Sequence, residues 1–399
     1  MTSELDAPVS GSDALSANVA SNRWSLLRWF GASATLTVPQ AAGPVAFSLV
    51  ALSLTGETSG GAAMILAMTL AQVAGAVPLT RLGKNLPSAT VLRLLVAFRT
   101  LALASVALCT AYEASLPWLI AFAAVAGSVN GAASGYLRSV LNHFTPVSQL
   151  PRALGIAATL NEMTFVLAPV AASGLGTASP VAAVLALTAL GAVPVLAVPH
   201  AGSAHITDMH PAGGSILSPA IVLWLVCAAA GSAAVAAIEI GAVALALNLG
   251  YEPAFAIIFT VPLCLASVAG GIWVSVRNRM ATRKTVVVQL FVMTLGSALV
   301  ALDRSIATTL VGAVLIGSVL APLGTYYSLT LDTLSSPRRR PEVFALLRTA
   351  NAVGIILASA ALTMMPLSTA LIMVTGLIGI VALAVAIAAL RRRAHDHPG

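Results

Sequence analysis

The chain has 399 residues, of which 58% are hydrophobic and only 8% are charged. A soluble domain carries about 25% charged residues, so the composition excludes a soluble enzyme or a nucleic-acid-binding protein of this length. The formal net charge is +7, but the basic residues lie between apolar segments, which points to a lipid bilayer and away from nucleic acid. At about 20 apolar residues per span plus short connections, the length accommodates about twelve transmembrane helices.

We expect residues 1–22 to form a cytoplasmic tail, because they lack the basic start and short apolar core of a signal peptide. The apolar segments that follow are broken by Gly, Pro and charged residues, and each is too long for a strand of about 4 to 8 residues. The sequence therefore predicts an all-α membrane protein. The expected spans are residues 28–54, 60–80, 88–111, 115–138, 151–175, 180–199, 219–248, 254–276, 284–302, 306–330, 341–365 and 368–390.

A polar stretch at 200–218 divides the spans into two groups of six. Its histidines, His205 and His210, have a spacing that fits no compact metal site, so we interpret the stretch as a cytoplasmic linker and predict no metal and no cofactor. The expected divisions are the tail 1–22, an N-terminal six-helix bundle 23–199, the linker 200–218, a C-terminal six-helix bundle 219–390 and a cytoplasmic tail 391–399.

Lys and Arg gather in alternate loops, and such loops face the cytoplasm. The opposite loops hold Glu57, Glu113, Glu252 and Asp303, with Arg304 as their only basic residue, and are expected outside. Both termini are therefore expected inside, in a multi-pass protein of a bacterial inner membrane. The basic loops contain Arg81 and Lys84, Arg138 and Arg152, Arg277, Arg279, Arg283 and Lys284, Arg338 to Arg340, and Arg391 to Arg393.

The two halves repeat each other at nearly constant spacing. Gly75 is matched 195 residues later by Gly270, and Asn161 is matched 190 residues later by Asn351. Because the matches fall in corresponding spans, the pattern predicts two parallel, pseudo-symmetric six-helix repeats. Further matches at these spacings are Glu57 with Glu252, Pro151 with Pro341, and Tyr136 with Tyr326.

In span number, duplication and basic loops, residues 24 to 393 resemble the major facilitator superfamily. The family's loop signature, Gly-x-Leu-x-Asp-Arg-x-Gly-Arg-Lys, is matched here at Arg81, Gly83 and Lys84. The resemblance implies that these residues and Arg277, which repeats the spacing of Arg81, form a conformational gate. Thr80 replaces the acidic residue of the family's charge cluster, so we expect that latch to be weaker or built differently here.

A second family pattern, associated with exporting antiporters, is similar to the small residues around Pro169 in span 5, where Thr164, Ala168, Ala172 and Ser173 replace the glycines. The resemblance therefore extends to the drug/proton antiporter branch. A third pattern departs, because Gly127 stands where the family has an Arg in span 4. That departure puts in doubt any proton relay built on the missing Arg.

Charged residues near the bilayer centre cost about 2.5 to 3.5 kcal/mol each and need a partner or a function. Glu162, near the middle of span 5, and Glu239, in the outer half of span 7, are the candidate proton-coupling residues. Each has an alternative: an ion pair for Glu162, with Arg99 of span 3 as the candidate partner, and a side chain reaching the external surface for Glu239. We expect Arg99 itself to be structural, with a carboxylate as one possible partner.

Uncharged polar residues inside the spans are candidates for the lining of a substrate cavity, and they could instead form hydrogen bonds between helices. The candidates are Gln40, Asn130, Asn161 and Asn351.

The sequence contains no nucleotide-binding loop, zinc motif or nucleophile elbow, so we do not expect an enzyme. The resemblance implies a secondary active transporter that works by alternating access. We expect a monomer that exports a small, largely apolar compound in exchange for protons. The alternatives are an uptake symporter or facilitator for a sugar or metabolite, and a sensor or assembly factor that kept the fold without transporting.

Overall fold

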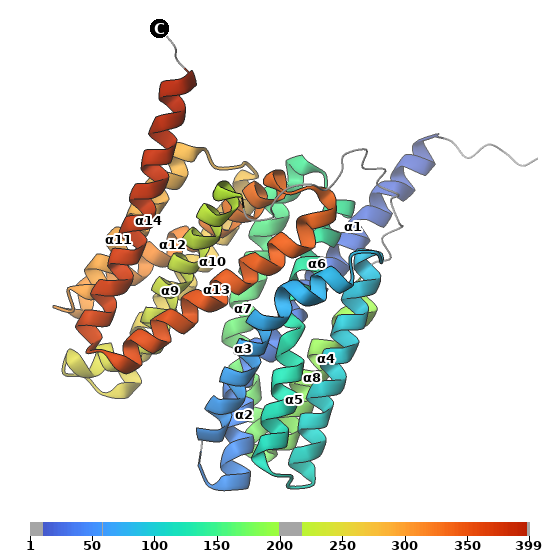
Figure 1. Ribbon diagram of the computed structural model, residues 1–399, viewed down its shortest axis with the longest axis vertical. Helices are drawn as coiled ribbons and strands as arrows, with labels where there is room; N and C mark the ends of the chain where they lie inside the picture. The colour runs from blue at the N-terminus through green and yellow to red at the C-terminus, as the bar shows by residue number, and fades with distance from the viewer. Residues whose placement is uncertain (1–10, 58, 199–217, 397–399) are drawn as a thin grey trace, which may run out of the picture.

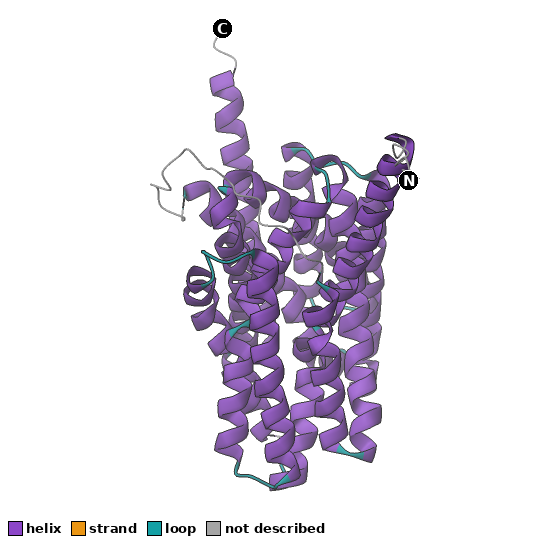
Figure 2. Ribbon diagram, turned by 90° about the vertical axis from the view of Figure 1, so that its right-hand side faces the viewer, coloured by secondary structure: helices purple, strands orange, loops and turns teal. Residues whose placement is uncertain are grey.

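The computed structural model describes the chain except residues 1–10, 58, 199–217 and 397–399. Within the described residues it contains helices and loops only, and the helices run from one end of the molecule to the other (Figure 2). Twelve helical segments in this part are long and apolar enough to cross a membrane. The predicted all-α fold with twelve spans is confirmed.

Six spans form each half of the molecule (Figure 1). The N-terminal half contains α1 (Gly11–Leu36), α2 (Val38–Thr55), α3 (Ser59–Leu82), α4 (Ser88–Ala111), α5 (Leu116–Ser128), α6 (Asn130–Phe144), η1 (Val147–Gln149), α7 (Leu150–Ala178) and α8 (Pro180–Ala197). The C-terminal half contains α9 (Pro219–Asn248), η2 (Pro253–Ala256), α10 (Ile257–Arg277), α11 (Arg283–Ala301), α12 (Ile306–Leu334), η3 (Pro337–Arg339), α13 (Arg340–Met364) and α14 (Leu367–Asp396).

The predicted tails and the predicted linker lie only partly within the residues that the structure describes. Helix α1 begins at Gly11, within the segment predicted as a tail, and α14 extends to Asp396. Of the predicted linker 200–218, all but Ser218 lies outside the described residues, and so do residues 1–10 and 397–399.

Spans 1 and 4 are each built from two helices, α1 with α2 and α5 with α6. At the first break the backbone N–H of Gln40 donates to the Thr37 carbonyl, which leaves the Leu36 carbonyl without its usual partner four residues on. Pro39, which has no N–H, stands at the start of α2. The break therefore creates a free carbonyl inside the N-terminal bundle.

In each half, a pair of glycines brings two helices into close contact, and the helices involved occupy equivalent positions in the two halves. A Cβ at Gly75 of α3 would overlap a carbonyl oxygen of α5, and one at Gly127 of α5 would overlap a carbonyl oxygen of α3. Gly270 of α10 and Gly317 of α12 meet carbonyl oxygens of each other's helices in the same way. The same close approach in both halves supports the predicted pseudo-symmetric repeat.

The two bundles meet at the end of the molecule that carries Arg81, Arg138 and η3, which we call the basic end. There α13 begins against α6, and Gly155 of α7 packs on Gly271 of α10 so closely that a Cβ at Gly155 would lie 2.7 Å from the Gly271 carbonyl oxygen. Toward the opposite end the bundles separate (Figure 1). The molecule is therefore closed at the basic end and splayed at the other.

Candidate functional site

Arg99, buried with 2% of its surface exposed, ties four spans together. Its Nη1 donates to the Leu36 carbonyl at 2.8 Å and to Asn130 Oδ1 at 3.2 Å, and its Nη2 donates to the Gly191 carbonyl at 2.7 Å. Arg99 is therefore structural, as expected, but the suggested carboxylate pair is wrong: among the described residues no carboxylate contacts it. The amide oxygen of Asn130, a predicted cavity residue, is engaged here inside the N-terminal bundle.

The two predicted proton-coupling acids lie close together across the boundary between the bundles. Glu162 belongs to α7 and Glu239 to α9, and their carboxylates are near enough to interact electrostatically. Cys264 and Ser267 of α10 lie beside this acidic pair. Glu162 is partly exposed and Glu239 is exposed, so neither side chain is enclosed within its own bundle.

A second contact between the bundles involves a residue that the sequence analysis missed. Arg348 of α13 donates from Nη2 to Oε1 of Gln40 in α2, and the Arg348 Nε has no hydrogen-bond partner among the described residues. Arg348 lies within the predicted span 341–365, so the test applied to Arg99, a charge inside an apolar run, would have found it. Gln40 was predicted to line a cavity and here faces the other bundle.

Asn351, one helical turn beyond Arg348, lines a pocket of about 140 Å³ in the C-terminal bundle. The pocket also contains Ser232 and Tyr327, and the Tyr327 hydroxyl is buried without a partner among the described residues. The rest of its wall is small or apolar, with Ala228, Gly231, Met293, Leu320, Leu323, Gly324 and Leu347. Asn161, the repeat equivalent of Asn351, precedes Glu162 on α7 and is partly exposed.

At the basic end, the predicted gate residue Arg81 forms an ion pair between the bundles. Its Nε lies 3.2 Å from Oε1 of Glu342 at the start of α13. Thr80, which stands in place of the family's acid, accepts at its carbonyl a hydrogen bond of 2.8 Å from the Tyr136 hydroxyl. The acid that pairs with Arg81 thus comes from the C-terminal half and not from position 80.

A buried polar network reinforces this closure. Arg138 of α6 donates to Ser328 of α12 at 2.9 Å, and Asn142 of α6 donates to Asp332 of α12 at 2.7 Å. Both bonds join residues that are 190 apart, the spacing of the repeat, so equivalent positions of the two halves meet. Asp332 also pairs with Arg340 at 3.2 Å.

The remaining gate residues play different parts. Gly83 lies under Tyr136, where a Cβ would come within 2.5 Å of the hydroxyl oxygen. Lys84 is exposed. The guanidinium of Arg277 lies 5.2 Å from the centre of the Trp273 ring on its own helix, so its contacts differ from those of Arg81.

The fold has clear relatives. A sequence model of the Major Facilitator Superfamily matches residues 29–359, and no curated protein sequence matches the chain. A solved bacterial homologue of the iron transporter ferroportin, in an outward-facing state, has a TM-score of 0.74 and 14% identity, covering 92% of this chain and 99% of that one.

Two further solved structures are similar. The human organic anion transporter MFSD10 has a TM-score of 0.69 and 14% identity, with 92% of this chain and 99% of that chain covered. The E. coli fucose:proton symporter FucP has a TM-score of 0.67 and 11% identity, with 93% and 98% covered. At these identities the likeness shows the fold alone.

Proposed function

This chain belongs to the Major Facilitator Superfamily, and from that premise we propose that it exports a small, largely apolar compound in exchange for protons by alternating access. The observation that carries the proposal is the acidic pair, Glu162 and Glu239, at the boundary between the bundles. Two carboxylates near enough to interact repel each other when both are charged, and binding a proton relieves that repulsion. Since the two acids belong to different bundles, their protonation is coupled in this proposal to the separation of the bundles.

The pocket beside Asn351 supports the proposed type of substrate. Its volume of about 140 Å³ and mostly apolar wall fit a small apolar group, and the hydroxyl of Tyr327 and the amide of Asn351 offer the few polar contacts that orient such a ligand. The small residues around Pro169 in α7 resemble the pattern of exporting antiporters, which favours export over uptake.

The exchange follows from where the acids lie. With the bundles separated opposite the basic end, protons reach the acidic pair and displace a cationic or polar group of the substrate. With the basic end open, the protons leave and substrate binds. Opening it requires the Arg81–Glu342 and Asn142–Asp332 contacts to break, so they stabilise one of the two states.

The test combines a susceptibility panel of diverse toxic compounds with flux measurements. A compound that the protein protects against is then followed in proteoliposomes with and without a pH gradient. We expect Glu162→Gln and Glu239→Gln to abolish uphill transport and its pH dependence while leaving membrane insertion intact. Glu252→Gln makes the same change at an exposed position and should behave as wild type.

Other results would contradict the proposal in distinct ways. Uphill transport with unaltered pH dependence in Glu162→Gln would remove the coupling role from that residue. Accumulation of a sugar or metabolite in the direction of proton flow would identify a symporter. An absence of flux for every compound would favour the sensor or assembly factor.

A further inference from the structure

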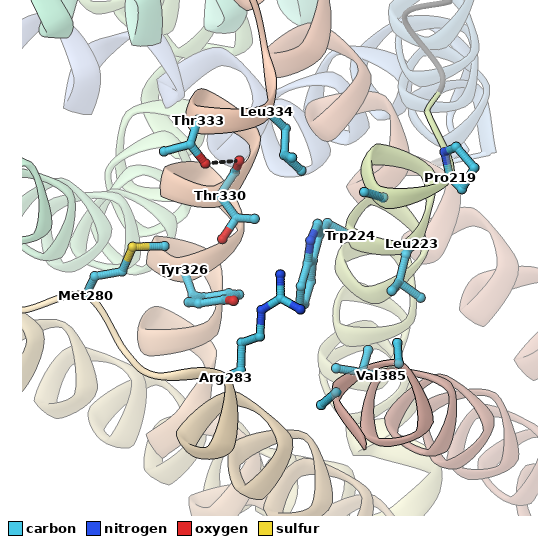
Figure 3. A pocket seen from close by; sticks show the side chains of 13 residues that line it. Pro219, Leu223, Trp224, Met280, Arg283, Tyr326, Thr330, Thr333, Leu334 and Val385 are labelled. Atoms are coloured by element: carbon cyan, nitrogen blue, oxygen red, sulfur yellow. Dashed lines mark hydrogen bonds between the residues drawn. The ribbon is translucent and has the colours of Figure 1, made fainter. Parts of the chain in front are cut away.

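A pocket of about 410 Å³ lies inside the C-terminal bundle, beside the end of α12 and the start of α11, and neither Glu162 nor Glu239 lines it. Figure 3 shows its lining side chains. Helices α9, α12 and α14 and the segment that leads into α11 form its wall. None of its lining residues is acidic, and Arg283 is the charged one. A guanidinium in a lining that contains no acidic residue makes the pocket electropositive.

Three hydrogen-bond donors, on Trp224, Arg283 and Thr330, line this pocket without hydrogen-bond partners among the described residues. The side chain of Arg283 extends between Tyr326 and Trp224 (Figure 3), and no ion pair to it is formed. The hydroxyl of Thr330, a residue with 8% of its surface exposed, is buried and unpaired. Buried polar groups normally find a partner, so Thr330 indicates a missing one.

The N-termini of two helices add to the positive potential. Helix α9 begins at Pro219 and α11 begins at Arg283, and both residues line the pocket. Backbone N–H groups at a helix start carry partial positive charge and bind anions. Their effect adds to that of the guanidinium at the same place.

The fold itself does not require this pocket, because the N-terminal bundle fills the equivalent place. Trp29, at 195 residues from Trp224, donates from its indole nitrogen to the Leu137 carbonyl at 2.8 Å, whereas Trp224 makes no side-chain hydrogen bond to the described residues. Val140, at 190 residues from Thr330, is fully buried in an apolar cluster that includes Trp29. Apolar packing in one half is thus replaced by polar donors and open space in the other.

We propose that the pocket binds the phosphate group of an anionic ligand, with Arg283, Trp224 and Thr330 as its donors. Arg recognises phosphate by paired, charge-assisted hydrogen bonds. The apolar part of the wall, Leu223, Val385, Ala388 and Ala389, fits the glycerol and first acyl carbons of a phospholipid. An anionic lipid headgroup and a soluble phosphate share this chemistry, and the experiment separates them.

The full-length protein, purified and stripped of lipid, is titrated with phosphatidylglycerol, phosphatidylcholine, inorganic phosphate and glycerol 3-phosphate, and binding is measured by native mass spectrometry and thermal unfolding. We expect phosphatidylglycerol to bind and stabilise the wild type, and Arg283→Gln to weaken this binding by about tenfold. Lys284→Gln removes the same charge one residue later, outside the pocket, and should bind like wild type. Competition by the soluble phosphates would identify a soluble ligand as the source.

A second variant, Thr330→Val, separates a loss of binding from a loss of stability. Because the hydroxyl has no partner to lose, the variant should unfold at the wild-type temperature or above, while its binding falls several-fold. Equal binding by phosphatidylglycerol and phosphatidylcholine would overturn the proposal. Wild-type binding in Arg283→Gln, or the same loss in Lys284→Gln, would also overturn it.

Discussion

At the level of single residues, Gly83 illustrates how a missing side chain supports the closed basic end. A Cβ there would lie 2.5 Å from the Tyr136 hydroxyl oxygen and 2.6 Å from Val91 Cγ1. We therefore expect Gly83→Ala to displace the Tyr136 ring, break its bond to the Thr80 carbonyl, and cost about 1 to 3 kcal/mol of stability, as overpacking does. Thermal unfolding of the purified protein measures the effect.

Gly174→Ala is the matched control for this change. Gly174 lies within α7, whereas Gly83 lies in the turn directly after α3. A Cβ at Gly174 would meet nothing within 4 Å, so alanine should leave the unfolding temperature unchanged or raise it slightly. An unfolding temperature for Gly83→Ala equal to that of this control would show that Tyr136 moves aside without cost.

At the level of helices, the break in span 1 depends on Arg99. The break frees the Leu36 carbonyl. Arg99 of α4 donates hydrogen bonds to this carbonyl and to the Gly191 carbonyl of α8. Arg99→Met should leave these buried acceptors unpaired and lower the free energy of unfolding by about 3 kcal/mol. Expression level and unfolding temperature in detergent measure this loss, and Arg304→Met, at an exposed loop residue, is the control.

Arg99→Met also tests whether Glu162 acts in proton coupling or as an ion-pair partner of Arg99. Since Arg99 bonds to carbonyls and an amide and not to Glu162, the effects of Arg99→Met and Glu162→Gln on stability should add, as they do for independent sites. Recovery of expression in the double variant would instead indicate a direct pair that forms in another conformation.

At the level of the whole molecule, the Arg81–Glu342 pair links the bundles across 261 residues of sequence. Because the Arg81 side chain is 60% exposed, the pair contributes at most about 1 kcal/mol, a shift of at most about fivefold between conformations. Arg81→Ala should therefore slow transport without preventing folding, by favouring the state that is open at the basic end.

A reporter at the interface measures this shift directly. Ala345, fully buried where α13 meets α6, is replaced by Cys in a background without the three native cysteines, and its labelling rate by maleimide is followed. Arg81→Ala should raise the rate, and exchanging the charges with Arg81→Glu and Glu342→Arg together should restore it. A rate that is the same in all variants would leave Arg81 with only a role in topology.

The number of spans, the duplication and the intramembrane charges could be predicted from the sequence alone. Each of these follows from a local requirement, because a segment in lipid must be apolar and must satisfy its backbone internally, so any charge within it stands out. Glu162 and Glu239 were identifiable on that ground, and Arg348 would have been by the same test. The chain length and the spacing of Gly75 and Gly270 sufficed for the two-bundle architecture.

Which of these groups meet depends on how the helices pack. Gln40 faces Arg348 across 308 residues, and Arg99 binds the Leu36 carbonyl, which is free because span 1 breaks at Thr37. Hydropathy indicates whether a segment can lie in the membrane, and the numbers of Lys and Arg residues indicate which loops are basic. Neither records the rotation of one helix about its axis or the distance between two bundles, and these two quantities set every pairing in the site.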